Sequence, residues 1–202
     1  EKLAKAASLE GADALLVQSY ACQASFDLER ALDLTQRAVH LDEWNVLAWV
    51  NLARLLFGMD RPEEAWNAID KAERLAPEDA EVQNLKGFLL LAQRKTDLAA
   101  AAFRKAIGVN PSLGEPHLGL ALVSMRQGDT GTASEEMSAA ILLEPQRSLF
   151  LSYWAKMLYQ LKRFDQTLDV LDMAARIYPR APNHHLYKGL VHAALNPPDE
   201  AV

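Results

Sequence analysis

Four prolines, Pro77, Pro111, Pro145 and Pro179, follow one another at a constant spacing of 34 residues. Proline ends helices because it lacks a backbone N–H and its ring clashes with the preceding turn. A helix stop that returns at one interval is typical of a repeat array, in which each repeat packs only on its neighbours. The spacing therefore predicts a series of equal helical blocks rather than a single globular enzyme domain.

Each block of 34 residues contains two helical patterns separated by a short polar break. The five complete blocks are 12–45, 46–79, 80–113, 114–147 and 148–181. The breaks lie at 25–27, 60–62, 94–96, 128–130, 162–164 and 196–198, in register to within one residue. Pro62, followed by Glu63 and Glu64, has the features of a helix start, since proline loses no hydrogen bond there and acids face the positive end of the dipole.

Small residues recur at fixed positions in both helices of each block. The first helices carry Ser19, Ala53, Gly87, Ala121, Ala155 and Gly189, and the second helices carry Ala31, Ala65, Ala99 and Ala133, then Ala38, Ala72, Ala106, Ala140 and Ala174. Mostly large apolar residues stand between those alanines, namely Thr35, Ile69, Phe103, Met137 and Leu171. Because antiparallel helices approach closely only over small side chains, this periodicity predicts packed helix pairs.

Composition excludes several classes of protein. Half of the residues are apolar, while 9 glycines and 9 prolines are set at intervals, which favours a folded all-α chain. The net charge of −6 is spread along the length, so no basic stripe predicts nucleic-acid binding. No apolar run approaches the ~18 residues of a membrane span, which predicts no membrane insertion and a soluble chain. A single cysteine, Cys22, excludes an intrachain disulfide.

The chain resembles the tetratricopeptide repeat family in the residues just described. Block 46–79 carries the family pattern most fully, with Trp49, Leu52, Ala53, Leu56, Ala65, Ile69, Ala72 and Pro77. The resemblance implies one all-α domain over residues 1–202, a right-handed superhelical solenoid of antiparallel helix pairs. Residues 1–11 are then expected to end a preceding repeat, and 182–202 to form a partial sixth one. Since neither end shows a polar capping helix, we expect a segment of a longer protein.

The resemblance also implies that first helices line a concave groove. Transferring the family's groove positions gives a partner-binding set of Tyr20, Asn51, Arg54, Phe57, Asn84, Phe88, Leu91, Leu122, Met125, Tyr153, Lys156, Tyr159 and Tyr187. Further positions on the same face include Val17, Leu47, Leu149 and Leu186. Exposed apolar surface of this extent indicates a bound partner, or coverage by neighbouring repeats or by further chain.

The predicted function is that of a non-catalytic scaffold binding a peptide or helix of a partner protein in this apolar groove. Two alternatives stay open: a structural or assembly arm of a larger envelope or export protein that self-associates, and a regulatory region of an enzyme whose catalytic domain lies elsewhere. The sequence does not identify the partner, and it leaves the compartment undetermined between cytoplasm and periplasm.

Candidate catalytic and metal-binding residues are sparse. His185 and His192 lie seven residues apart and would share a helix face, but no acid accompanies them in that helix. Both fall on family packing positions, so we expect partly buried histidines rather than ligands. Cys22 likewise replaces a packing residue and has no histidine near it in the repeat frame. The sequence therefore predicts no catalytic site, no metal and no cofactor.

Overall fold

The structure is a computed structural model that describes residues 11–177 and 182–195, with side chains described for 11–177 and 186–195. These residues form eleven α-helices and no strand. The helices are α2 (Ala12–Ala24), α3 (Leu28–Leu41), α4 (Val46–Gly58), α5 (Pro62–Leu75), α6 (Ala80–Ala92), α7 (Thr96–Val109), α8 (Gly114–Gln127), α9 (Thr130–Leu143), α10 (Ser148–Gln160), α11 (Phe164–Ile177) and α12 (Pro182–Leu195). None of the described helices is long and apolar enough to cross a bilayer.

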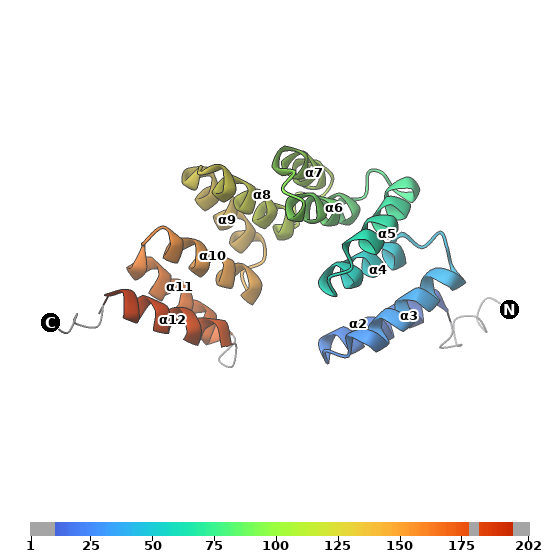
Figure 1. Cartoon of the computed structure of the whole chain (residues 1–202), viewed down its shortest axis with the longest axis horizontal. Helices are drawn as coiled ribbons and strands as arrows, with labels where there is room; N and C mark the ends of the chain where they lie inside the picture. Colours follow the sequence, from blue (N-terminus) through green and yellow to red (C-terminus); the bar gives the residue numbers. More distant parts are fainter. Residues whose placement is uncertain (1–10, 178–181, 196–202) are drawn as a thin grey trace. The chain divides into compact units, whose positions relative to one another are not determined.

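Successive helices form antiparallel pairs, as Figure 1 shows for α2 with α3, α4 with α5, α6 with α7, α8 with α9 and α10 with α11. The predicted all-α fold of paired helices is confirmed. Contacts within the chain define two compact units, which meet in sequence between Pro111 and Ser112. The first unit contains α2 to α7 and the second α8 to α12. Continuity of a single domain over 1–202 stays a prediction.

The recurring prolines end the second helices as predicted. Pro77, Pro111 and Pro145 each lie two residues beyond the last residue of α5, α7 and α9. Pro62 is the first residue of α5, with Glu63 and Glu64 in the first turn. Pro179 and the last predicted break, 196–198, lie outside the described residues.

A left-handed backbone conformation closes the first helix of every complete pair. Positive φ angles occur at Phe26 (61°), Asp60 (58°), Arg94 (61°), Gly128 (82°) and Lys162 (57°), all at the same position of the 34-residue block. The next N–H in each case donates to a carbonyl five residues back, from Asp27 to Cys22 at 2.9 Å in the first pair and from Asp129 to Ser124 at 3.0 Å in the fourth. This pattern satisfies helix-end carbonyls and turns the chain into the second helix.

The predicted helix crossings form the core. Ala31, Ala65, Ala99 and Ala133 are fully buried, as are Ile69, Phe103 and Met137 between the alanine positions. Gly87 lies under the ring of Phe103, which has room only because residue 87 lacks a side chain. Gly189 is different, because nothing lies within 4 Å of the position that its Cβ would take. The second helix expected to cross there falls outside the described residues.

Candidate partner-binding site

The predicted groove residues of the first unit come from α2, α4 and α6, the first helices of three successive pairs. Their accessibility differs widely. Tyr20 is 48% exposed, and Arg54, Phe57 and Phe88 are half-buried. The others, Asn51, Asn84 and Leu91, are only 2%, 1% and 4% exposed. The exposure that direct contact with a partner requires is therefore present at Tyr20, Arg54, Phe57 and Phe88, and missing at the other three positions.

An ion pair joins α4 and α6 on this face. Nη2 of Arg54 lies 2.9 Å from Oε2 of Glu81. Tyr20, from α2, lies within electrostatic reach of both: burial raises the pKa of its phenol, the positive charge of Arg54 opposes that shift, and the negative charge of Glu81 adds to it. Tyr20 thus remains a neutral hydroxyl at physiological pH, able to donate or accept a hydrogen bond. The three side chains form an accessible polar centre on an otherwise apolar face.

Asn51 belongs to a buried hydrogen-bond network instead. Its Nδ2 donates to the hydroxyls of Ser19 at 3.2 Å and Thr35 at 2.9 Å, and these two oxygens are 2.7 Å apart. Its Oδ1 accepts from Nε2 of Gln23 at 3.1 Å. Ser19 and Thr35 each also bond the carbonyl of Ala31, at 3.0 and 2.8 Å. The network links α2, α3 and α4, so the Asn51 amide positions helices rather than facing a partner.

This network was missed by the sequence reasoning, which placed Ser19 among the small crossing residues and Thr35 among the space-filling ones. The available signal was that hydroxyl groups occupy packing positions in two adjacent helices while an asparagine follows in the next. Buried polar groups require partners, so three of them in neighbouring helices indicate mutual hydrogen bonding.

Phe88 is also partly used inside the protein. Its ring packs edge to face on Phe103, with centroids 4.9 Å apart and planes at 70°. The accessible surface of the first unit is extended by Val17 and Leu47, both exposed apolar side chains on α2 and α4. Val17, Tyr20 and Leu47 are the large apolar side chains that α2 and α4 leave exposed.

The groove residues of the second unit lie on α8, α10 and α12. Leu122 and Met125 on α8 are half-buried, as are Tyr153 and Tyr159 on α10, whereas Lys156 is exposed. The ring of Tyr159 lies 6.3 Å from that of Tyr187 on α12 and 5.8 Å from that of Phe164 on α11. The structure therefore brings Tyr159 and Tyr187 together in an aromatic cluster, and Phe164 joins it from outside the predicted set.

Exposed apolar residues are not confined to the first helices. Leu98 and Val109 on α7 and Leu142 on α9 are all exposed, with Leu98 at 58% and Leu142 at 82%. The sequence reasoning assigned the exposed apolar surface to the groove alone and missed these positions. Because they lie on second helices, away from the predicted groove residues, they can serve as control positions in mutational tests.

Within the part of the chain whose side chains are described, the remaining candidate residues form no group that could hold a metal ion. Nδ1 of His117 lies 2.7 Å from Oε2 of Glu136, an ion pair between α8 and α9 when the imidazole is protonated. His192 is exposed, so the expectation of partial burial is wrong for it. The side chain of His185 lies outside the described residues. Cys22 is a partly buried free thiol packed against the core of the first unit.

Comparison with known proteins gives consistent matches. Profiles of the tetratricopeptide repeat match residues 23–87, 80–113 and 118–182. The type IV pilus assembly protein PilF of Pseudomonas aeruginosa is 29% identical over 126 residues, which are 61% of this chain and 49% of PilF. The chain thus spans about half the length of that relative.

Solved structures show the same fold at low sequence identity. TTC0263, a tetratricopeptide repeat protein of Thermus thermophilus, has a TM-score of 0.83 and 18% identity, covering 90% of this chain and 99% of that one. A chain of the APC/C hetero-tetramer Cut9–Hcn1 has a TM-score of 0.81 and 17% identity, covering 94% of this chain and 38% of that one.

Proposed function

Because this chain belongs to the tetratricopeptide repeat family, we propose that it is a non-catalytic scaffold which binds a peptide or helix of a partner protein on the face of its first helices. Preformed stacked helices suit this work, since binding does not have to order the receptor first. A structural relative, solved as the Cut9–Hcn1 hetero-tetramer, is itself a protein–protein assembly, which supports the scaffold role.

The observation that carries the proposal is the composition of the accessible face formed by α2, α4 and α6. Exposed Val17, Tyr20 and Leu47 supply apolar contact area, and the Arg54–Glu81 ion pair supplies both a donor and an acceptor. Tyrosine and arginine are enriched among residues that dominate binding energy, because each combines contact area with directional hydrogen bonds. An amphipathic peptide meets both requirements of such a surface.

A displayed library of random peptides, selected for binding to the whole chain, tests this proposal. We expect a class of selected peptides to bind Tyr20→Glu at least about tenfold more weakly than the wild type, since the substitution places a charge in the apolar contact area. Leu98→Glu is the matched control, because it adds the same charge at a similarly exposed position on α7. Circular dichroism should show unchanged helicity for both variants. The proposal is wrong if every selected peptide binds both variants equally.

The relationship to PilF favours a second candidate, an assembly component that holds other proteins together in a larger structure such as a pilus. Production of this protein in Pseudomonas aeruginosa that lacks PilF would test it. Restored surface pili would support an assembly role, and normal protein levels without pili would contradict it. Self-association, which belongs to the same candidate, is measured by sedimentation of the purified chain. The enzyme-linked regulatory role stays a prediction.

A further inference from the structure

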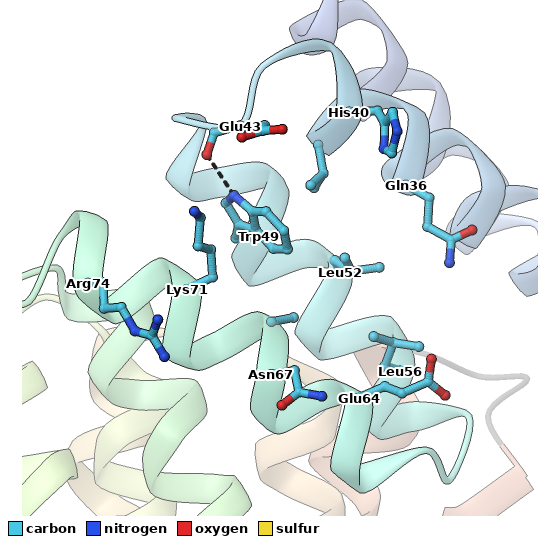
Figure 2. Close-up of a pocket in the computed structure, with 12 residues that line it drawn as sticks. Gln36, His40, Glu43, Trp49, Leu52, Leu56, Glu64, Asn67, Lys71 and Arg74 are labelled. Carbon is cyan, nitrogen blue, oxygen red and sulfur yellow. Dashed lines mark hydrogen bonds between the residues drawn. The ribbon is translucent and has the colours of Figure 1, made fainter.

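A hollow of about 560 Å³ lies on the first unit between α3, α4 and α5 (Figure 2). Its floor is apolar, made by Val39 of α3, Leu52 and Leu56 of α4 and Ala68 of α5, and Trp49 forms one wall. The volume falls within the range of about 300–1,000 Å³ that is usual for ligand-binding sites.

This hollow is separate from the face proposed above to bind a peptide. On α4, Trp49, Leu52 and Leu56 follow one another at helical spacing and form one stripe, directed toward α3 and α5. Leu47 and Arg54 belong to a different stripe of the same helix, and the Arg54 guanidinium reaches Glu81 on α6. A ligand in the hollow would therefore lie on the side of α4 that faces α3 and α5, the second helices of the first two pairs.

Trp49 is held in a fixed orientation at the edge of the hollow. Its Nε1–H donates to the backbone carbonyl of Glu43 at 2.9 Å, which satisfies the polar atom of the indole. Nζ of Lys71 lies 6.0 Å from the centre of the ring. As Figure 2 shows, the indole N–H faces the Glu43 carbonyl and the Lys71 side chain lies beside the ring. A half-buried aromatic wall of this kind offers apolar contact without an unsatisfied N–H.

Charge around the hollow is uneven. Lys71 and Arg74 stand three residues apart on α5, hence on one side of the helix, and neither forms an ion pair within the residues that the structure describes. Two acids also line the hollow. The Glu64 carboxylate accepts hydrogen bonds from Nε and Nη2 of Arg61, at 2.7 and 2.8 Å. The other acid, Glu43, lies in the loop between α3 and α4. The α5 side therefore attracts a carboxylate.

The mouth of the hollow is lined by exposed polar side chains, including Gln36, His40 and Asn67. An apolar floor inside a polar, solvent-exposed rim is the usual anatomy of a site that accepts a side chain of another protein. The rim groups can form hydrogen bonds with the backbone amides of a bound peptide segment. A small apolar acid has no backbone amides and would leave these groups unused.

We propose that this hollow binds a short segment of a partner protein in which a large apolar side chain stands next to an acidic one. The apolar side chain enters between Leu52, Leu56 and Trp49. The acidic side chain pairs with Lys71 and Arg74 through charge-assisted hydrogen bonds. The protein would then have two independent peptide sites on opposite sides of α4.

Selection from a displayed peptide library tests the proposal directly. The whole wild-type chain serves as the target, and the double variant Lys71→Gln/Arg74→Gln serves for counter-selection. We expect enriched peptides to contain an acidic residue adjacent to Leu, Phe or Trp, and to bind the double variant about 10- to 100-fold more weakly. The control double variant Arg37→Gln/Arg104→Gln removes the same charge outside the hollow and should bind like the wild type.

The position of the bound peptide is read from tryptophan signals. The chain has four tryptophans, so fluorotryptophan labelling gives four resonances that single Trp→Phe variants assign. Addition of an enriched peptide should shift the Trp49 resonance and leave that of Trp154 unchanged. Binding should survive Tyr20→Glu, which separates this site from the first-helix face and makes failure of one proposal distinguishable from failure of the other.

Three outcomes would overturn the inference. The first is that no enriched peptide distinguishes the wild type from Lys71→Gln/Arg74→Gln. The second is that the enriched peptides lack acidic residues or leave Trp49 unshifted. The third is a self-association of the purified chain, seen by sedimentation, that the double variant abolishes, because a second copy would then be the occupant of the hollow.

Discussion

The ring of Phe103 on α7 lies directly over the backbone of Gly87 on α6, so that a Cβ placed at residue 87 would come within 2.5 Å of Phe103 Cε1. Phe103 is fully buried and also packs on Phe88. The Phe103 ring would therefore have to shift against its neighbours to admit a Cβ at residue 87. This contact fixes how closely α6 and α7 approach.

We therefore expect the overpacking in Gly87→Ala to cost about 1–3 kcal/mol, the usual range for a packed core. The gain in helix propensity from replacing glycine by alanine, about 1 kcal/mol, offsets part of that cost, so the net expectation is a destabilisation of up to about 2 kcal/mol. Urea unfolding followed by circular dichroism measures the difference. Gly108→Ala on α7 is the matched control, since nothing lies within 4 Å of its Cβ position. It should leave stability unchanged or raise it, and equal loss in both variants would contradict the packing argument.

A second prediction concerns the buried network around Asn51. Asn51→Ala should destabilise the protein by about 1–3 kcal/mol, because the hydroxyls of Ser19 and Thr35 lose a shared donor and Gln23 loses one of its two acceptors. A double-mutant cycle with Thr35→Val should show a coupling of about 0.5–3 kcal/mol, as direct hydrogen-bond partners do.

Thr167→Val is the control for this cycle. Thr167 is equally buried, but it bonds the carbonyl of Arg163 and lies in the second unit. Its effect should add to that of Asn51→Ala within about 0.3–0.5 kcal/mol. Coupling of the same size to Thr167 and Thr35 would show that the measured energy does not come from the network.

These two sites show what the sequence could predict. The Gly87–Phe103 crossing was predictable because its first position carries a small residue in every block and its second carries a large one in most blocks, so the 34-residue period reveals the contact. The Asn51 network depends on three polar residues, Ser19, Thr35 and Asn51, that come together at one place in the chain. The repeat pattern does not reveal a contact that occurs only once. The hollow beside Trp49 likewise depends on the space left between α3 and α5, which follows from side-chain packing in three dimensions. Helix positions were thus predictable, whereas burial of individual groove residues was not.

A third prediction uses the left-handed turn between paired helices. Phe26 adopts φ 61° and is 88% exposed, so its side chain contributes little packing to offset the strain of that conformation. Relief of about 1–2 kcal/mol in Phe26→Gly is partly offset by glycine's greater freedom when unfolded, about 0.5–1 kcal/mol. The net expectation is a stabilisation of up to about 1.5 kcal/mol in thermal or urea unfolding. Phe26→Ala retains the strain and should bring no such gain.

The last prediction concerns pH and the Lys86–Glu73 ion pair between α6 and α5. Burial alone would raise the pKa of Glu73, but hydrogen bonds from Lys86 and Gln83, together with the charges of Lys86 and Lys105, outweigh it and hold that pKa below its ordinary value. A carboxyl whose pKa is lower in the folded state stabilises the protein above the pKa it has when unfolded. That contribution is lost as the pH falls through the folded-state pKa.

Glu73→Gln should accordingly reduce the free energy of unfolding at neutral pH by up to about 1 kcal/mol, the upper end of the range for ion pairs near the surface. The difference from the wild type should shrink as the pH falls below about 4, because protonation then removes the same charge from the wild-type protein. Urea titrations across this range measure it. Asp33→Asn is a suitable control, since Asp33 pairs with Arg37 at 3.6 Å on the exposed surface of α3 and should change stability little at any pH. A Glu73→Gln difference that stays constant with pH would show that the lost contact is steric and not electrostatic.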